Sequence, residues 1–200
     1  MVLQDFGKGI TTTNRLTMKK LLLILTFLLM FFNLKILFSQ NIIYHFDNEV
    51  NLKEWVIVND DVMGGVSKSN LNINKDGNGV FGGKISTAYN GGFASVRYTC
   101  KRIYIKENMS IRLKIKGDEK EYQLRIKANT DDYYSYLLPF KTSGKWEEII
   151  IPLKEMYASF RGRRLDIKNF NNDYIEQITF LIGNKKNESF NLIIDSITIQ

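Results

Sequence analysis

The sequence contains few of the residues that build disulfides, metal sites and nucleophilic catalytic centres, with one cysteine and one histidine among 200 residues. Cys100 as the lone cysteine excludes an intramolecular disulfide and a cysteine-based zinc site. His45 as the lone histidine leaves no Ser-His or Cys-His pair unless His45 itself supplies the base. Both residues lie in strand-like stretches, FASVRYTC and YHFD. We therefore predict that each is an ordinary strand residue.

The N-terminal part of the chain carries a leader pattern. From Met18 it reads MKKLLLILTFLLMFFNLKILFSQ, with two lysines, an apolar run and a small residue at the end. This pattern is typical of a bacterial-type secretory signal peptide, and we assign it to residues 18–39, with residues 1–17 as an upstream extension. It predicts a secreted or periplasmic protein. An uncleaved membrane anchor in the cell envelope is the alternative, although Lys35 interrupts the apolar run.

The net charge is concentrated in the leader. The whole chain carries +7, but residues 1–39 hold five basic residues and one acidic residue, which leaves +3 for the remainder. A nucleic-acid partner requires clustered Lys and Arg with stacking aromatic rings. The one basic cluster outside the leader is FRGRR at 160–164. Composition therefore argues against a nucleic-acid partner, and membrane contact is expected only through an uncleaved leader.

The rest of the chain alternates apolar and polar residues with the period of a β-strand. In SIRLKIK (110–116) and EYQLRIK (121–127), every second residue is apolar, and the two segments are joined by a Gly-Asp turn. We predict that these two segments pair as a hairpin. Further strands are expected at YSYLLPF, WEEIIIPL, IEQITFLIG and FNLIIDSITIQ, with one short helical turn at PLKEMYASF. Evenly spaced short strands without a Pro-rich linker predict one all-β sandwich over residues 40–200.

Three glycine-containing segments interrupt this pattern. They are NDDVMGGVS at 59–67, STAYNGGFASVRY at 86–98 and YASFRGRRLD at 157–166. Glycine permits a positive φ and close backbone approach, and aspartate favours turns. We expect the three segments to meet at one rim of the sandwich, where loops on a rigid scaffold bind partners. The structural alternative is an ion pair from Asp60 or Asp61 to Arg97.

These segments, with KGDxxxYxLR and GKWEEIIIPL, give the chain a resemblance to the complex I intermediate-associated protein 30 family over Phe46 to the C-terminus. The resemblance implies a jelly-roll β-sandwich of the galactose-binding-domain-like type. It also implies a chaperone-type role in respiratory complex I assembly. The family motifs, and hence the candidate binding residues, fall on Trp55, Asp60, Asp61, Met63, Gly64, Gly65, Ser67, Gly91, Gly92, Phe93, Ser95, Arg97, Arg161, Gly162 and Arg163.

No enzyme is predicted. Asp60 and Asp61 are adjacent, and neighbouring side chains of an extended segment point to opposite faces, whereas a glycosidase needs two carboxyl groups flanking one bond. No cofactor is expected, with a structural calcium ion at these aspartates left open. Two binding functions remain. The first is a module that binds a protein partner through rim loops, for which an apolar rim around Met63 and Phe93 is expected. The second is a secreted carbohydrate-binding module, in which the tyrosines of DDYYSY (131–136) could contribute.

Overall fold

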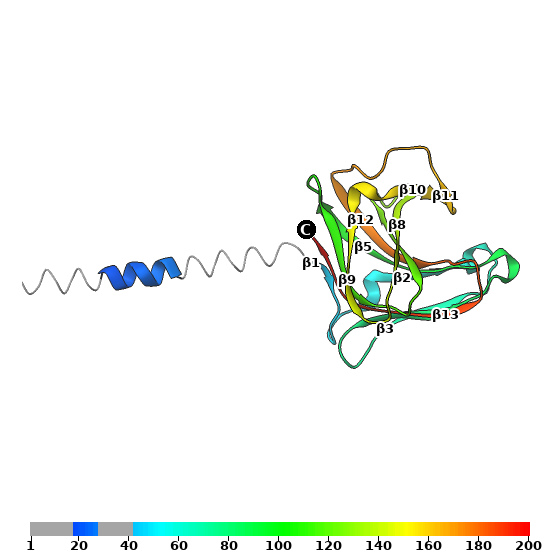
Figure 1. The fold of residues 1–200 in the computed structure, drawn as a ribbon, viewed down its shortest axis with the longest axis horizontal. Helices are drawn as coiled ribbons and strands as arrows, with labels where there is room; N and C mark the ends of the chain where they lie inside the picture. The colour runs from blue at the N-terminus through cyan, green and yellow to red at the C-terminus, as the bar shows by residue number, and fades with distance from the viewer. Residues whose placement is uncertain (1–17, 28–41) are drawn as a thin grey trace, which may run out of the picture. The chain divides into compact units, whose positions relative to one another are not determined.

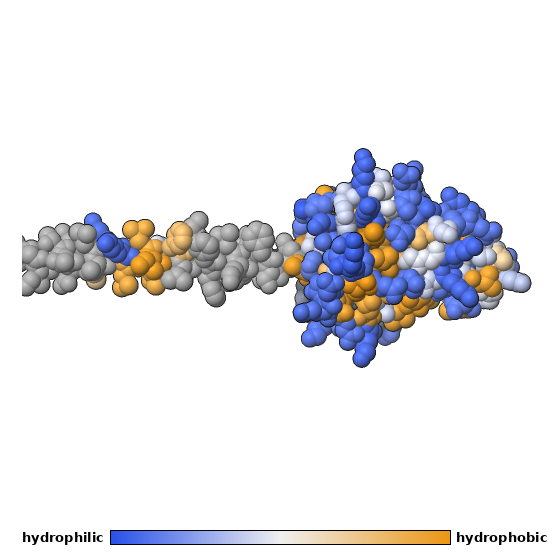
Figure 2. Space-filling view, turned by 90° about the horizontal axis from the view of Figure 1, so that it is seen from below, coloured by the Kyte–Doolittle hydropathy of each residue, from blue (hydrophilic) through white to orange (hydrophobic). Residues whose placement is uncertain are grey.

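The computed structural model describes residues 18–27 and 42–200 (Figure 1). Residues 18–27 are helical and expose apolar side chains, such as Leu21 and Phe27. In Figure 2 this segment has hydrophilic atoms at its start and hydrophobic atoms after them. Within the described residues, no helix is both long and apolar enough to cross a membrane. The predicted signal-peptide end at residue 39 and the upstream extension lie outside the described residues.

Residues 42–200 form a compact unit built almost wholly from antiparallel strands, which confirms the predicted fold class. The strands are β1 (Ile42–His45), β2 (Trp55–Asn59), β3 (Lys68–Ile73), β4 (Gly79–Ile85), β5 (Ala94–Tyr104), β6 (Ser110–Lys116), β7 (Glu121–Lys127), β8 (Ser135–Lys141), β9 (Trp146–Pro152), β10 (Tyr157–Phe160), β11 (Arg163–Arg164), β12 (Tyr174–Ile182) and β13 (Glu188–Ile199). The short 3-10 helices are η1 (Leu52–Glu54), η2 (Asp60–Met63), η3 (Ala88–Asn90) and η4 (Leu153–Glu155). The helical turn expected at PLKEMYASF is η4, and β10 follows it directly.

The strands form two sheets that pack face to face (Figure 1). One sheet has the order β3-β4-β13-β6-β9, and β1 also pairs with β13. The other sheet has seven strands in the order β11-β10-β8-β7-β12-β5-β2. A single hydrophobic core lies between them, as expected for a β-sandwich.

The alternation of apolar and polar residues correctly predicted which side of these strands faces the core. Ile111, Leu113 and Ile115 of β6 are fully buried, and so are Tyr122 and Leu124 of β7. Their polar neighbours point away from the core, as the period-two pattern requires. The outward side of β7 therefore carries Gln, Arg and Lys at positions 123, 125 and 127.

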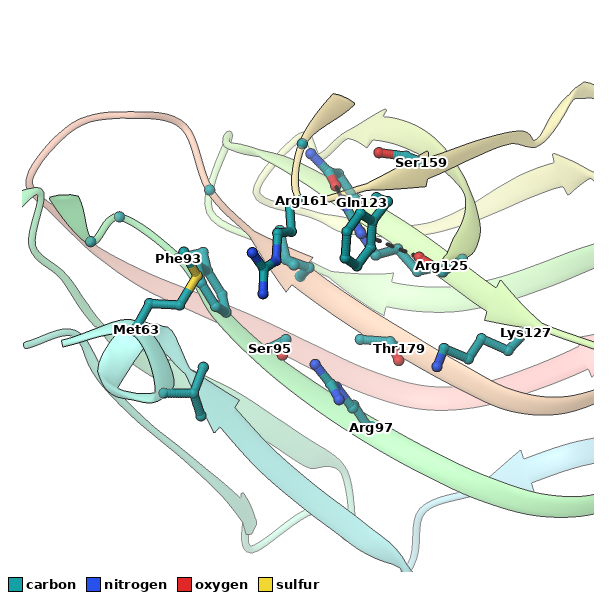
Figure 3. A pocket seen from close by; sticks show the side chains of 18 of the residues that line it. Met63, Phe93, Ser95, Arg97, Gln123, Arg125, Lys127, Ser159, Arg161 and Thr179 are labelled. Carbon is teal, nitrogen blue, oxygen red and sulfur yellow. Dashed lines mark hydrogen bonds between the residues drawn. The ribbon is translucent and has the colours of Figure 1, made fainter. Parts of the chain in front are cut away.

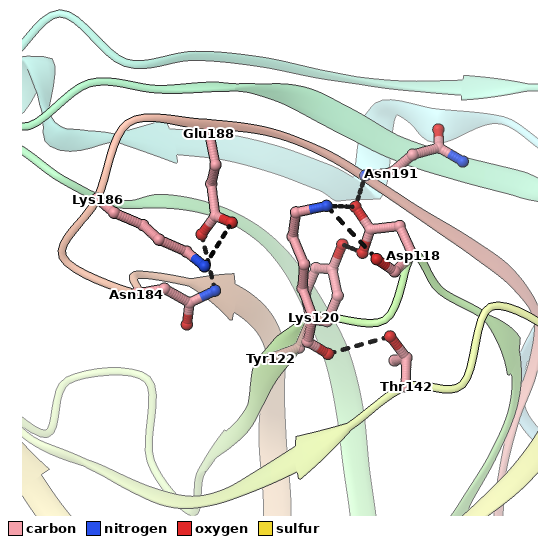
Figure 4. Close-up of polar contacts among 8 residues, drawn as sticks. All are labelled: Asp118, Lys120, Tyr122, Thr142, Asn184, Lys186, Glu188 and Asn191. Atoms are coloured by element: carbon pink, nitrogen blue, oxygen red, sulfur yellow. Dashed lines mark hydrogen bonds and ion pairs between the residues drawn. The ribbon is translucent and has the colours of Figure 1, made fainter.

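The predicted β6–β7 hairpin is wrong. β6 pairs with β9 and β13, whereas β7 pairs with β8 and β12, so the two strands lie in different sheets. The connecting residues are fixed by Asp118, whose carboxylate accepts hydrogen bonds from Lys120 Nζ at 2.7 Å, Tyr122 OH at 2.8 Å and the Asn191 backbone N–H at 2.9 Å (Figure 4). The Gly-Asp turn thus carries the chain from one sheet to the other.

The two residues expected to be ordinary strand residues are both found in strands. His45 ends β1, and its Nδ1 lies 4.0 Å from a carboxylate oxygen of Asp195. Cys100 is half-buried in β5, and burial raises the pKa of its thiol to about 11. A thiol with a raised pKa is a poor nucleophile at neutral pH, which fits a structural residue.

Candidate functional site

The NDDVMGGVS segment folds around the carboxylate of Asp60. Asp60 is fully buried at the start of η2, directly after β2. Its Oδ1 accepts the Ser67 backbone N–H at 2.9 Å, and its Oδ2 accepts the Ser67 hydroxyl at 2.5 Å. Oδ2 also accepts the backbone N–H groups of Gly92 at 2.6 Å and Phe93 at 3.3 Å. One side chain therefore ties the Asp loop to the Gly-Gly-Phe segment.

Two glycines of these segments are required because they approach Asp60 closely. A Cβ added at Gly65 would lie 2.4 Å from Asp60 Cγ, and one at Gly91 would lie 2.5 Å from Asp60 Oδ2. Both distances are far below ordinary carbon contacts. Glycine is required at position 64 for a different reason. The φ angle of Gly64 is 87°, a left-handed backbone conformation that residues with a side chain rarely adopt. The Gly-Gly pairs are thus explained by packing and backbone geometry.

The protonation of Asp60 is set by two opposing effects. Burial would raise its pKa, but the hydrogen bonds from Ser67, Gly92 and Phe93 outweigh burial and lower the pKa below its usual value. The carboxylate is therefore ionised at neutral pH and is satisfied by N–H and O–H donors. Calcium is bound by oxygen atoms, whereas the groups around this carboxylate are hydrogen-bond donors that already occupy both of its oxygens. Among the described residues, no group of three or more His, Cys, Asp or Glu side chains is placed to hold a metal ion.

The ion pair considered for the aspartates and Arg97 is not formed in the described sandwich. Both carboxylate oxygens of Asp60 accept hydrogen bonds from Ser67, Gly92 and Phe93. Asp61 is exposed, and its Oδ1 accepts the neighbouring Val62 backbone N–H at 3.0 Å. Arg97 points instead into a cleft on the outer face of the seven-stranded sheet (Figure 3).

This cleft is the main candidate site. It has a volume of about 650 Å³, which is within the usual range for ligand sites. Its floor is formed by five adjacent strands, β10, β8, β7, β12 and β5. The loops around η2, η3 and the β10–β11 turn close its rim. It is lined by Val62, Met63, Asn90, Gly91, Gly92, Phe93, Ser95, Arg97, Gln123, Arg125, Lys127, Tyr133, Ser135, Ser159, Phe160, Arg161, Gly162, Gln177, Thr179, Leu181, Gly183 and Lys185.

Strand register places the side chains of the floor in rows. Thr179 of β12 lies opposite Arg97 of β5 on one side and opposite Arg125 of β7 on the other. In the neighbouring row, Gln177 lies opposite Lys127. Directly opposed residues share one face of a sheet, and adjacent strands are about 4.8 Å apart. The two arginines therefore flank a small hydroxyl residue at the centre of the floor (Figure 3).

The rim carries exposed apolar and aromatic side chains. Val62 is 67% exposed and Met63 is 60% exposed in η2. On the opposite side, Tyr133 is 67% exposed and packs edge to face against Phe160, with 5.3 Å between the ring centroids. The rim thus offers a hydrophobic edge on one side and an aromatic edge on the other.

The three glycine-containing segments each contribute to this cleft, although not with every residue that the motifs suggested. Among the candidate binding residues, the cleft is lined by Met63, Gly91, Gly92, Phe93, Ser95, Arg97, Arg161 and Gly162. The candidates that do not line it are Trp55, Asp60, Asp61, Gly64, Gly65, Ser67 and Arg163. Trp55 is buried in the core, stacked on Tyr98 at 5.1 Å between ring centroids. Asp60 and Ser67 shape the rim from beneath.

Sequence reasoning missed much of the floor. Gln123, Arg125 and Lys127 alternate along β7, and Gln177 and Thr179 alternate along β12. Their alternation is visible in the sequence but looks like any solvent-facing side of a strand. Only the strand order, which puts β12 between β7 and β5, brings them next to Arg97.

Comparison with known proteins places the chain in a family. The family model for complex I intermediate-associated protein 30 matches residues 44–194. The chain belongs to this family. A curated family member, the mitochondrial complex I intermediate-associated protein 30 of Mus musculus, is 22% identical. The match covers 80% of this chain and 56% of that relative, so the chain spans about half the length of the curated protein.

The fold of this chain is similar to that of solved carbohydrate-binding modules. The Family 11 module of Clostridium thermocellum, solved in complex with a β-1,3-1,4-mixed-linked tetrasaccharide, superposes with a TM-score of 0.57 at 17% identity. That match covers 78% of this chain and 93% of the module. A second structure of the Family 11 module comes from a cellulosomal cellulase of the same organism and gives the same TM-score and the same 17% identity. That match covers 78% of this chain and 92% of the module. At this identity the likeness concerns the fold alone, and it agrees with the predicted jelly-roll sandwich.

Proposed function

We propose that the protein is a non-catalytic binding module that holds an oligosaccharide in the cleft of its seven-stranded sheet. The observation that carries this proposal is the cleft itself, a hollow of about 650 Å³ across five adjacent strands. Its floor offers amides and hydroxyls, such as Gln177, Ser135 and Thr179, that can pair with sugar hydroxyls. Its rim offers the Tyr133 ring as a platform. This is the usual combination for a polar ligand with an apolar ring face.

Similarity of fold supports the same function without deciding it. The Family 11 module was solved with a tetrasaccharide, and it has the architecture of this chain. Fold alone does not transfer a ligand. The proposal therefore depends on the side chains of this cleft and is tested on them.

The test is affinity electrophoresis of the purified protein in gels that contain soluble polysaccharides, both neutral and charged. We expect retardation by at least one polysaccharide. A Tyr133→Ala, Gln177→Ala variant should lose that retardation while it keeps the unfolding midpoint of the wild type. A protein that no polysaccharide retards, or a variant retarded as strongly as the wild type, would contradict the proposal.

Protein binding through the rim is a second candidate function, favoured by the exposed side chains of η2. Val62 and Met63 are more than half exposed, and Tyr89 of the neighbouring η3 is 75% exposed. Exposed apolar clusters mark protein contacts. The name of the murine relative associates it with complex I intermediates, so a protein partner is consistent with the family.

A photo-crosslinking amino acid at Met63, compared with one at Ile150, separates this second function from the first. Ile150 is 52% exposed but belongs to β9 of the other sheet. A single adduct of fixed mass at Met63, absent at Ile150 and abolished by Val62→Glu, is the expected result. Equal labelling at both positions would reject the rim as a docking site.

We further propose that the module works outside the cytoplasm. The support is the leader pattern, in which Lys19 and Lys20 precede an apolar run. Fractionation of cells that make the full-length protein tests this. We expect the mature protein in the periplasm or medium, with a mass that matches cleavage near residue 39. An intact chain in the membrane fraction would favour the anchor, and an intact soluble cytoplasmic chain would reject both.

A further inference from the structure

The charge of the cleft is one-sided. Among the described residues that line it, five are Arg or Lys, and none is Asp or Glu. Three of the five, Arg97, Arg125 and Lys127, are half-buried in the floor, whereas Arg161 and Lys185 are exposed at the rim. The sandwich as a whole carries only a small excess of positive charge. The cationic character is therefore local to this face.

Among residues 18–27 and 42–200, no carboxylate forms an ion pair with any of the three floor cations. Arg125 donates from Nε and Nη2 to Gln123 Oε1 at 3.0 and 2.9 Å, and from Nη1 to Ser135 Oγ at 3.2 Å. Lys127 Nζ donates to the backbone carbonyls of Thr130 at 3.1 Å and Asp132 at 2.6 Å. All of these acceptors are uncharged.

Arg97 is the least satisfied of the three. Within the described sandwich its guanidinium has no hydrogen-bond or ion-pair partner, although it is half-buried. The structure does pair other cations well, since Arg102 Nε lies 2.8 Å from Glu176 and Lys120 Nζ lies 2.7 Å from Asp118. A guanidinium carries five donors in a planar fork suited to carboxylate, phosphate or sulfate groups. Arg97 offers this fork to the cleft.

The floor cations also repel one another. Burial lowers the pKa of Arg97. The pKa of Arg125 is lowered to about 10, mainly by burial; Tyr157 opposes this shift, and the positive charge of Arg97 adds to it. Burial lowers the pKa of Lys127 as well, and Arg97 adds to it, while Asp132 and Asp131 partly oppose the shift. All three remain protonated at neutral pH. The free protein thus holds unfavourable positive charge that an anion would relieve.

We propose that the cleft binds an anionic oligosaccharide, with an acidic group of one sugar lying over Thr179 between Arg97 and Arg125. This inference rests on the proposed function and adds the ligand class. A carboxylate or sulfate there would accept from both guanidinium groups, with Lys127 one row away. The neutral donors and acceptors beside the cations, Gln177 and Ser135 among them, would bind the sugar hydroxyls.

Two features favour a glycan over an acidic peptide. The site lies on the face of the sheet, whereas extended peptides commonly add to a sheet edge through their backbones. The row across Arg97, Thr179 and Arg125 consists of polar and charged residues. Spaced charges separated by hydroxyls and amides match an acidic sugar followed by further hydroxyl-bearing sugars.

The test measures binding of the full-length protein to oligogalacturonate and to its fully methyl-esterified form by isothermal titration calorimetry. The two probes share one sugar backbone and differ only in the methyl esters, which remove the negative charges. We expect oligogalacturonate to bind at least about tenfold more tightly, with an affinity that falls as NaCl is raised. A sulfated and an unsulfated chondroitin pair repeats the comparison for sulfate.

Two variants that remove the same number of charges locate the site. Arg97→Gln, Arg125→Gln should weaken oligogalacturonate binding about tenfold or more, whereas Lys68→Gln, Lys84→Gln should not change it. Lys68 and Lys84 are exposed and directly opposed in β3 and β4 of the other sheet. If the double arginine variant is unstable, Arg97→Gln alone serves, because the guanidinium of Arg97 has no hydrogen-bond or ion-pair partner among the described residues. Arg97→Lys should restore part of the affinity.

The outcomes separate the two proposals. Equal affinity for the charged and esterified probes, or loss of binding in both double variants alike, overturns the anionic assignment but leaves the glycan-binding function standing. A protein that binds poly-glutamate as tightly as oligogalacturonate overturns the glycan in favour of an acidic peptide. Failure to bind any glycan, charged or neutral, overturns the inference together with the function on which it rests.

Discussion

Gly91 lies against the buried carboxylate of Asp60, so closely that a Cβ at residue 91 would stand 2.5 Å from Asp60 Oδ2. The next residue donates its backbone N–H to the same oxygen. The Asp loop and the Gly-Gly-Phe segment are therefore one structural unit, although they are about thirty residues apart in sequence. This unit shapes the rim of the cleft.

Alanine at the contacting glycines should destabilise the fold. We expect Gly65→Ala and Gly91→Ala each to lower the free energy of unfolding by about 1–3 kcal/mol, because the new methyl group would overlap Asp60. Gly82→Ala is the control, since its nearest contacts are an ordinary 3.4 Å and its φ is not positive. Urea unfolding measures all three. If Gly82→Ala lost as much free energy of unfolding as Gly91→Ala, the destabilisation would come from the loss of any glycine and not from overlap with Asp60.

Asp60 and Asp61 should differ sharply despite being neighbours. Asp60→Asn removes a charge that four donors satisfy and should cost about 3 kcal/mol. Asp61→Asn changes an exposed side chain and should lie within about 0.5 kcal/mol of the wild type. The comparison uses urea unfolding at neutral pH. Similar losses for the two variants would reject Asp60 as the organising residue.

The same carboxylate should make stability depend on acid. The pKa of Asp60 is lower in the folded protein than its usual value, so its contribution is complete only well above the unfolded-state pKa of about 4 and is lost as the pH falls through the folded-state pKa. The wild type should therefore lose more stability than Asp60→Asn between about pH 5 and pH 2. Thermal unfolding at several pH values checks this. Parallel curves for both proteins would contradict it.

Cys100 should react slowly while the protein is folded. Its pKa is raised to about 11 by burial, so at pH 8 its thiolate fraction is roughly a hundredfold below that of a free cysteine. Alkylation by iodoacetamide, followed by mass spectrometry, measures the rate. The urea-unfolded protein is the control and should react at the rate of a free thiol. Fast modification of the folded protein would show that β5 opens locally.

The polar contacts of Asp118 should be energetically coupled to Tyr122. A double-mutant cycle with Asp118→Asn and Tyr122→Phe should give a coupling of about 1 kcal/mol, because the phenol donates to this carboxylate at 2.8 Å. Asp118 also holds Lys120 and the Asn191 backbone (Figure 4). Additive losses would indicate that the connection is fixed by Lys120 and Asn191 instead.

The local pattern of residues was sufficient to predict much of the fold, but it predicted little of the binding surface. Alternation identified the buried sides of β6 and β7 because burial of a strand face is a property of its own residues. It gave the wrong partner for both strands, because pairing depends on where the chain goes after Asp118. The candidate binding residues likewise included Arg97 but not Arg125, its neighbour across Thr179, although Arg125 ends the KGDxxxYxLR motif. That proximity arises from strand order, which no local pattern contains.

The pairing of β1 with β13 has a consequence for how the chain reaches its structure. Ile42 of the first sandwich strand lies opposite Thr198 of the last, and β13 also separates β4 from β6. The six-stranded sheet can therefore assemble only after nearly the whole domain has been synthesised. Topologies with such high contact order fold on the millisecond to second scale. Until then the edges of β4 and β6 are unpaired, and association between chains competes with folding.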